Sequence, residues 1–180
     1  MSDPAAPTVS RQAPVGMITL RADLGGPAVA EAVGDVTGCA VPAALRIETA
    51  GDRAAAWMSP DELMLFVPRA EAAEAVARLN ARLDGTHRLV ADVSEARALF
   101  RVAGRGARDV VAKGAPIDLA PTVFGPGDFR RTRLGQVAAA IWMRESDALE
   151  LMCFSSVAGF VEAWLATAAE PGTLPGFFEP

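Results

Sequence analysis

The apolar residues of this chain follow two spacings, and glycine or proline separates most of the runs. A spacing of two, or a short continuous apolar run, predicts a β-strand, whereas a spacing of three and four predicts an amphipathic helix. In the first half the pattern predicts strands over residues 15–21, 45–49, 54–58 and 63–67. It predicts helices from Pro27 to Gly34 or Gly38, and over residues 70–83.

The second half shows the same order of elements. A long strand is predicted over residues 92–102, with a bend near Ser94 and Glu95, and a short helix follows Gly104 and Gly106 and stops at Gly114. After a loop over 120–129, strands are predicted over 131–142 and 147–154. The last helix is predicted over 157–168, with a buried stripe formed by Phe160, Val161, Trp164 and Leu165.

The two halves also match in their letters, which indicates an internal repeat of roughly 85 residues. AAAWM at 54–58 corresponds to AAIWM at 139–143, and each is followed by a turn, an apolar strand and an alanine-rich helix. The further matches are Asp61 with Asp147, Leu63 with Leu149, Leu65 with Leu151 and Leu79 with Leu165. The alternative is two unrelated halves in which the Trp-Met pairs coincide by chance.

The repeat predicts an α+β fold of two similar strand-helix-strand-strand-helix units that form one layered domain. Each unit is expected to have four strands or fewer, and the two are expected to share one core with the helices outside. The predicted organisation is a flexible N-terminal arm at 1–14, a first unit at 15–86, a second unit at 87–169 and an extended C-terminal tail at 170–180.

Composition narrows the classes of function. The net charge of −5 argues against a nucleic-acid partner, because neutralising phosphates takes an excess of lysine and arginine. No apolar run approaches the ~20 residues that a membrane span requires, and the N-terminus lacks the apolar core of a secretory signal, so we expect a cytoplasmic protein. The mean hydropathy of +0.24 indicates either apolar surface buried in a partner or simply an alanine-rich chain.

The chain offers few residues for catalysis. His87 is the only histidine and lies in the polar turn GTHR, which is typical of a solvated loop. With Cys39 and Cys153 far apart in sequence, a zinc site is not expected, and a disulfide between them stays open. The turn Gly104–Gly106 could accept a phosphate, but glycines that shape a turn explain it better. Asp92 is predicted to cap the backbone locally. We therefore expect no catalytic, cofactor-binding or metal-binding residues.

Two features suggest a partner interface. Arg130, Arg131 and Arg133 cluster before a strand and, with Arg101, Arg105 and Arg108, could hold a carboxylate or an acidic patch; a charged, solvated strand edge is the default interpretation. Phe177 and Phe178 lie in a Pro- and Gly-rich tail, which either clamps onto its own domain or inserts into another subunit. The second interpretation predicts that deleting residues 172–180 leaves the melting temperature almost unchanged.

Four stretches together resemble one family. They are residues 92–119, RRTRLGQVAAAIWM at 130–143, F-x-E-A-W-L at 160–165 and WMSPDELML at 57–65. They resemble the gamma subunit of heterotetrameric sarcosine oxidase, over residues 20–165. That family is similar to the tetrahydrofolate-binding domain of the glycine-cleavage aminomethyltransferases. Those enzymes carry a carboxylate in the strand region where this chain reads RLGQVAAAIW, so their folate chemistry is not carried over.

The resemblance implies a fold like the aminomethyltransferase folate-binding domain. It implies a non-catalytic gamma subunit in a complex that oxidises sarcosine to glycine, formaldehyde or methylene-tetrahydrofolate, and hydrogen peroxide. In that family FAD, FMN and NAD belong to the alpha and beta subunits and zinc to a delta subunit, while tetrahydrofolate serves the complex. The alternative is a stand-alone folate-binding protein or one-carbon transferase, in which the arginines around Arg131 grip the glutamate tail of folate.

Overall fold

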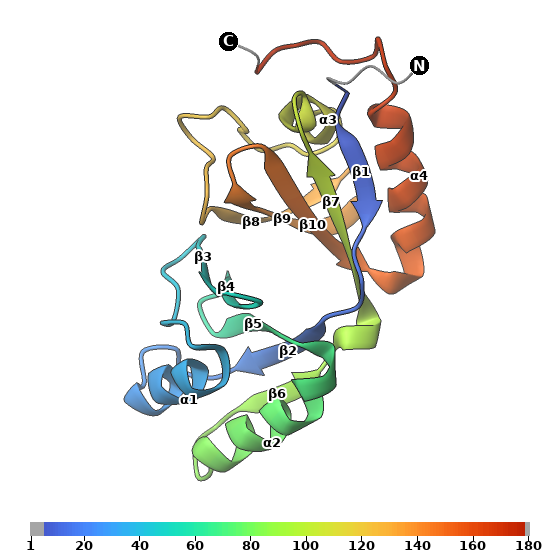
Figure 1. Ribbon diagram of the computed structural model, residues 1–180. Helices are drawn as coiled ribbons and strands as arrows, with labels where there is room; N and C mark the ends of the chain where they lie inside the picture. The colour runs from blue at the N-terminus through green and yellow to red at the C-terminus, as the bar shows by residue number, and fades with distance from the viewer. Residues whose placement is uncertain (1–5, 179–180) are drawn as a thin grey trace. The chain divides into compact units, whose positions relative to one another are not determined.

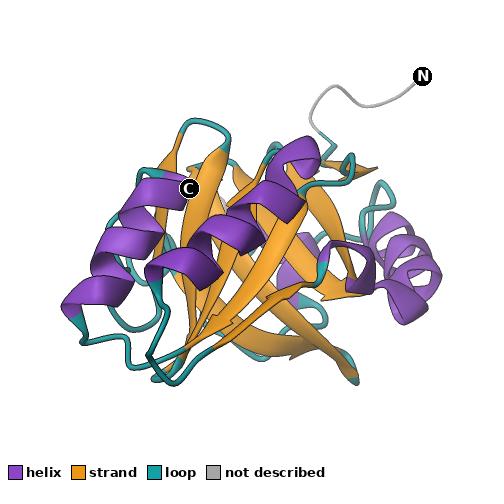
Figure 2. Cartoon of the chain, turned by 90° about the horizontal axis from the view of Figure 1, so that it is seen from below, coloured by secondary structure: helices purple, strands orange, loops and turns teal. Residues whose placement is uncertain are grey.

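The computed structural model describes residues 6–178, which form two compact units (Figure 1). The first unit is Pro14–Glu95, and the second joins residues 96–178 to residues 6–13. Each contains one five-stranded antiparallel sheet and two α-helices. Figure 2 shows the helices lying flat along the strands. The predicted α+β class is therefore confirmed, although each sheet has one strand more than expected.

The sheet of the first unit has the strand order β3-β4-β5-β2-β6. Its strands are β2 Gly16–Arg21, β3 Ile47–Ala50, β4 Arg53–Ser59, β5 Glu62–Val67 and β6 Leu89–Asp92. Its helices are α1 Pro27–Thr37 and α2 Ala72–Arg82, and a 3-10 turn, Arg69–Glu71, precedes α2. Pro27 suits the first turn of α1 because its φ is already helical, and Gly38 ends that helix at a φ of 70°.

The sheet of the second unit has the equivalent order β8-β9-β10-β7-β1. Its strands are β1 Thr8–Arg11, β7 Arg97–Ala103, β8 Phe129–Leu134, β9 Val137–Glu145 and β10 Ala148–Phe154. Its helices are α3 Ala107–Ala112 and α4 Ala158–Ala168, and a 3-10 turn, Ser155–Val157, precedes α4. The repeat is thus a structural repeat, since strands and helices recur in one order and position.

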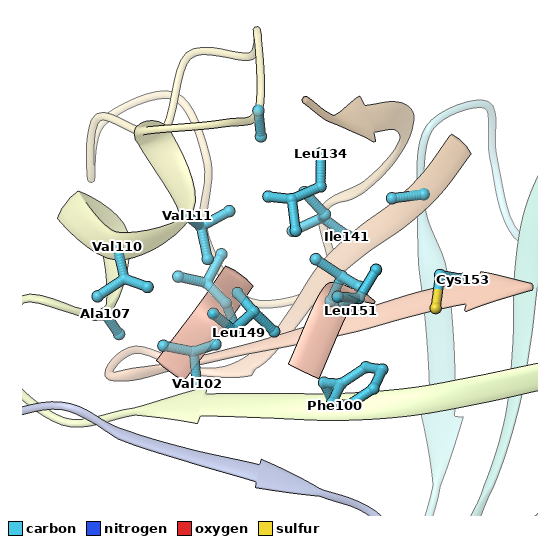
Figure 3. Close-up of a cluster of buried hydrophobic side chains, with 14 of the residues drawn as sticks. Phe100, Val102, Ala107, Val110, Val111, Leu134, Ile141, Leu149, Leu151 and Cys153 are labelled. Carbon is cyan, nitrogen blue, oxygen red and sulfur yellow. The ribbon is translucent and has the colours of Figure 1, made fainter. Parts of the chain in front are cut away.

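Each unit has a hydrophobic core between its sheet and its helices. In the second unit, Val110 and Val111 of α3 point toward Leu149 and Leu151 of β10 (Figure 3). A separate cluster in the first unit joins α1 and α2 to the helix-facing residues of β2 and β5. Each sheet thus buries alternate residues under its own pair of helices, and the expectation of one core shared by the two units stays a prediction.

The first strand of each repeat pairs with the sheet of the other repeat. Strand β1 comes before β2 in the chain but pairs with β7, with Thr8 opposite Ala103. Conversely, β6 comes before β7 but pairs with β2, with Ile18 opposite Asp92. This exchange explains why the units divide after Glu95, whereas the sequence repeat divides near residue 86.

Three expectations for the strands need correction. Residues 8–11 of the expected flexible arm form β1, and residues 1–5 of that arm lie outside the described residues. The strand expected over 92–102 is two strands in different sheets, separated by a 3-10 turn at Ser94–Ala96. The strand expected over 131–142 is a hairpin of β8 and β9, whose turn places Gly135 at a φ of 59°.

The predicted buried stripe of the last helix is only half right. Val161 and Leu165 are fully buried, and Trp164 is partly buried against the core. Phe160 is instead 54% exposed. The spacing of three and four does not distinguish a helix with one apolar face from a helix that is apolar nearly all round.

Candidate functional site

The second unit contains a partly open pocket of about 610 Å³ at the point where β7 turns into α3. Polar residues from the turn, from α3 and from the β9–β10 hairpin line it, together with apolar residues of the 121–126 loop, of β10 and of the tail. The lining includes Gly104, Arg105, Gly106, Arg108, Asp109, Pro121, Pro126, Ser146, Asp147, Leu149 and Phe178. Its volume is within the range of small-molecule sites.

Two glycines shape the floor of this pocket. Gly104 and Gly106 have φ values of 98° and 82°, a region that side chains with a Cβ rarely adopt. The Gly104 N–H donates a hydrogen bond of 2.8 Å to the Asp147 carbonyl, which ties the turn to the β9–β10 hairpin. In the first unit the Ala22 N–H makes the equivalent bond of 3.0 Å to the Asp61 carbonyl. The Gly-Arg-Gly motif is thus a structural turn that also forms part of a pocket.

Asp109 is the most unusual polar residue of the pocket, because it is only 1% exposed. Its Oδ1 accepts a hydrogen bond of 3.0 Å from the Phe177 backbone N–H. Its Oδ2 is buried and has no hydrogen-bond partner among residues 6–178. A buried acceptor without a donor costs free energy, so this atom is a candidate contact for a ligand.

The Arg108 side chain is hydrogen-bonded to the loop beside the pocket. Its Nη1 donates hydrogen bonds of 2.6 Å and 2.8 Å to the carbonyls of Leu119 and Phe124. Burial lowers the pKa of the Arg108 guanidinium, and the charge of Asp147 opposes that shift. The guanidinium therefore fixes the loop that forms one wall of the pocket.

The C-terminal tail lies against its own unit as far as Phe178. Leu174 packs on Gly106 so closely that a Cβ there would lie 2.7 Å from the leucine Cδ1. Lys113 Nζ donates to the carbonyl of Ala168 and to the Thr173 hydroxyl, at 2.6 Å and 2.7 Å. Phe178 packs against the core, whereas Phe177 is 78% exposed. The tail thus clamps onto its own unit and presents one ring, so its deletion is now expected to destabilise this unit.

The predicted arginine cluster is divided in the structure. Arg101 pairs with Glu150 at 2.8 Å and with Glu145 at 3.0 Å, away from the pocket, whereas Arg105 and Arg108 line it. Arg130, Arg131 and Arg133 are on β8, an edge strand, and none of them lines the pocket. Arg130 lies 5.6 Å from the Phe124 ring and 3.6 Å from Asp128, and Arg131 and Arg133 are exposed.

The first unit has a pocket of about 570 Å³ at the equivalent position. His87 lines it together with Asp61 and Arg21, whose side chains form an ion pair of 3.0 Å. Hydrogen bonds from the Ser59 hydroxyl and from Arg21 hold the pKa of Asp61 below its usual value. This pocket therefore differs from its counterpart in having its aspartate already paired.

The remaining candidates have local structural roles. Asp92 Oδ1 accepts hydrogen bonds from the hydroxyl and the backbone N–H of Ser94, as the sequence predicted, and the hydroxyl bond lowers the pKa of Asp92. Cys39 and Cys153 are buried free thiols in different units, and burial raises the pKa of Cys153. Over residues 6–178 no three His, Cys, Asp or Glu side chains gather closely enough to bind a metal. No helix in this range is long and apolar enough to span a membrane.

The outward face of α4 is a feature that sequence reasoning missed. Phe160, Ala163 and Thr167 are exposed on successive turns, and Glu162 is the only charged residue of the helix. The equivalent positions of α2 are Glu74, Ala77 and Ala81, and the charged Arg78 and Arg82 of α2 correspond to Trp164 and Ala168 of α4. Aligning the two helices through Leu79 and Leu165 would have found this contrast, because the charged positions of one are apolar in the other.

Comparisons with known proteins extend these observations. The family model described as "Sarcosine oxidase, gamma subunit family" matches residues 21–170. Among solved structures, the chain is similar to one from heterotetrameric sarcosine oxidase of Corynebacterium sp. U-96, in complex with pyrrole 2-carboxylate. That similarity has 25% identity and a TM-score of 0.84, and it covers 93% of this chain and 86% of the other. A search of curated proteins gives no match.

Two further structures share the fold at lower identity. Glycine cleavage system aminomethyltransferase T from Bartonella henselae is 14% identical with a TM-score of 0.64, over 92% of this chain and 47% of that one. The regulatory subunit of aspartate kinase from Thermus thermophilus, in a ligand-free form, is 17% identical with a TM-score of 0.51, over 91% and 98%. At these identities the similarity shows the fold alone, and it confirms the aminomethyltransferase-like fold.

Proposed function

Because the chain belongs to the sarcosine oxidase gamma subunit family, we propose that it is the non-catalytic gamma subunit of a heterotetrameric, flavin-dependent sarcosine oxidase. The observation that carries this proposal is the family match over residues 21–170. The similarity to a chain of a heterotetrameric sarcosine oxidase, which extends over 93% of this chain, supports it. The complex would oxidise sarcosine to glycine with release of hydrogen peroxide.

The proposal assigns the redox chemistry to other subunits. FAD, FMN and NAD would be held by the alpha and beta subunits and zinc by the delta subunit, with tetrahydrofolate used by the complex. In the strand region where the folate-dependent relatives carry a carboxylate, this chain has buried Ala139, Ala140 and Ile141 on β9. These apolar side chains do not fit a proton-transferring acid, so the folate reaction is not placed on this chain.

The role of this chain would be to dock on the large subunit. Phe160 on α4 supports this role, because its large apolar ring is 54% exposed. Exposed Phe177 at the tail is a second candidate contact, whereas Phe178 is engaged with its own core. Arg130, Arg131 and Arg133 on β8 stay candidates for an acidic patch of a partner.

Co-purification from the native host tests the proposal. The full chain, tagged at its N-terminus, is expected to bring down flavin-containing subunits, and the eluate is expected to release hydrogen peroxide when sarcosine is added. A tagged chain recovered only as a free monomer, without flavin absorbance, would contradict the assembly. Peptide mass spectrometry of the eluate identifies which of the alpha, beta and delta subunits are present.

The alternative, a stand-alone folate-binding protein, rests on the shared fold alone. Calorimetric titration of the isolated chain with tetrahydrofolate separates the two. A genuine folate pocket would give binding in the micromolar range, about −8 kcal/mol. We expect no heat of binding, because buried apolar residues occupy the region of β9 where the folate-dependent relatives carry a carboxylate.

A further inference from the structure

The pocket of the second unit contains two carboxylates with unequal environments. Asp109 is buried, with Oδ1 bonded to the Phe177 N–H and Oδ2 without a donor among residues 6–178. Asp147 is exposed, and its carboxylate forms no hydrogen bond or ion pair with the described side chains. An ionised carboxylate can accept hydrogen bonds but cannot donate them, so an occupant of this pocket must supply N–H or O–H donors.

The equivalent pocket of the first unit shows how such an aspartate is satisfied. Asp61 occupies the position of Asp147, because the backbone bonds from Ala22 and Gly104 reach these two residues. The residue before Ala22 is Arg21, which pairs with Asp61 at 3.0 Å. The residue before Gly104 is Ala103, which carries no charge. The second unit therefore lacks an arginine at the position of Arg21, although the charge of Asp147 still acts on Arg108.

The two arginines that line the pocket are placed differently from Arg21. Arg108 is committed to the carbonyls of Leu119 and Phe124. Arg105 is exposed and follows Gly104 in the turn, whereas Ala103 precedes it. The charge of Asp147 opposes the lowering of the Arg108 pKa by burial, but the hydrogen bonds described for the Arg108 guanidinium go to the two carbonyls. The charge of the two arginines does favour anions nearby, so an anionic ligand is the competing outcome that an experiment must separate.

The remaining walls of the pocket are apolar. Leu149, Pro121, Pro126 and the ring of Phe178 line it. An aromatic face beside carboxylates is a favourable environment for an organic cation, since the ring attracts positive charge and the apolar walls contact its carbon atoms. A bare metal ion would find only two carboxylates and no further acidic ligand among these lining residues.

We propose that this pocket binds a small organic ammonium ion, whose N–H groups donate to Asp109 Oδ2 and to the Asp147 carboxylate while its carbon body contacts Phe178 and Leu149. This inference concerns a second property of the chain and does not depend on assembly with a large subunit. It deals with binding only and places no reaction in the pocket.

Titration of the isolated full-length chain with benzylammonium, followed by calorimetry and by NMR shifts, tests the site. We expect saturable binding with a dissociation constant of about 1 mM or tighter. Asp109→Asn and Asp147→Asn are expected to weaken it at least about tenfold, since each removes one charge-assisted hydrogen bond. Asp109→Asn keeps a carbonyl oxygen for the Phe177 N–H, so the tail can stay in place.

The matched control is Asp61→Asn, which removes the equivalent carboxylate from the first unit and is expected to leave benzylammonium binding unchanged. Benzyl alcohol, which has the same ring but no charge, is expected to bind at least about tenfold more weakly. If Asp109→Asn fails to fold, exposed Asp147→Asn still tests the site.

Three results would overturn the proposal. The first is no saturable binding of benzylammonium to the wild-type chain, and the second is binding that both aspartate variants leave unchanged. The third is tighter binding of benzoate or inorganic phosphate than of benzylammonium in this pocket, which would show that Arg105 and Arg108 govern its selectivity. None of these results bears on co-purification with flavoprotein subunits, so failure here and failure of the proposed function are distinguishable.

Discussion

Helices α2 and α4 occupy the same place in the two repeats, yet three positions that are charged in α2 are apolar in α4. In α2, Arg78 and Arg82 pair with Asp35 of α1, at 2.8 Å and 3.4 Å. These pairs lower the pKa of Asp35, chiefly through the hydrogen bond from Arg78. In α4 the equivalent positions are Trp164 and Ala168, and Phe160 replaces Glu74.

The apolar residues that replace these charges in α4 differ in how far they are buried. Trp164 has a structural task, because its ring packs on Gly114 so closely that a Cβ there would lie 2.6 Å away. Phe160 is instead 54% exposed, and the equivalent position of α2 carries Glu74. The first repeat thus shows that the fold does not need an apolar residue here, which makes docking the better explanation for Phe160.

The largest expected effect comes from giving α4 the surface of α2. Phe160→Glu restores the residue type of its repeat counterpart and should weaken assembly with the large subunit by about 2–4 kcal/mol, as for an interface hot spot. Because Phe160 is half exposed, the free energy of unfolding of the isolated chain should change by less than about 0.5 kcal/mol. Size-exclusion chromatography of the complex and urea unfolding of the isolated chain measure the two effects.

A matched pair of variants controls for charge alone. Ala163→Glu and Ala77→Glu are the same substitution at equivalent, exposed positions of α4 and α2. Only Ala163→Glu should impair assembly. Equal effects of the two variants, or no effect of Phe160→Glu, would remove α4 from the interface.

The next effect separates the two neighbouring rings of the tail, which meet edge to face at 5.0 Å. Phe178→Ala should lower the free energy of unfolding by about 1–2 kcal/mol, since partial burial forfeits part of the ~3–5 kcal/mol of a fully buried ring. Phe177→Ala, at 78% exposure, should cost less than about 0.5 kcal/mol. Chemical denaturation of both variants provides the measurement, and equal losses would contradict the packing of Phe178.

The sequence predicted most elements because their signals are local. The stripe Ala72, Ala75 and Leu79 and the proline in the first turn of α1 act within a few residues, and both helices formed where predicted. Strand β1 carries no such signal, because only Val9 among its four residues faces the core and its pairing partner lies about ninety residues away. The hairpin turn at Gly135 was missed because a single glycine between Leu134 and Val137 is a weak turn signal.

For the candidate site, the sequence identified the turn but not the pocket. Gly104–Gly106 was recognised as a glycine turn before a helix, and that is its structure. Asp109 had no signal, because its burial results from the tail, which returns to it from residue 177. Residues brought together over such separations are decided by tertiary packing, and a single sequence does not reveal them.

A third contrast lies at one cross-strand position of the two sheets. In the first unit Thr19 of β2 faces Met64 of β5, and in the second unit Arg101 of β7 faces Glu150 of β10. Glu150→Met alone should destabilise the chain by about 1–2 kcal/mol, less than the ~3–5 kcal/mol for a fully buried pair, because Arg101 keeps Glu145.

The double variant Arg101→Thr with Glu150→Met transfers the pair of the first unit into the second. We expect its stability to be within about 1 kcal/mol of wild type, since replacing both partners removes the desolvation cost along with the attraction. Thermal and urea unfolding measure it. A double variant less stable than the single variant would show that the ion pair itself holds this sheet together.

The smallest effect is a pH dependence that comes from the burial of Glu150. Burial raises the pKa of Glu150 above its ordinary value, and the neighbouring Arg101 only partly opposes that shift. The folded chain therefore binds the proton of Glu150 more tightly than the unfolded chain, so this residue makes stability fall as pH rises from about 4.3 through the raised pKa. The slope cannot exceed about 1.4 kcal/mol per pH unit for one group.

Urea unfolding of the wild type and of the double variant from about pH 4 to about pH 8 measures this dependence. The difference between their free energies of unfolding isolates Glu150, because the other titrating groups contribute equally to both proteins. A difference that rises with pH would mean that Arg101 stabilises the carboxylate more than burial penalises it.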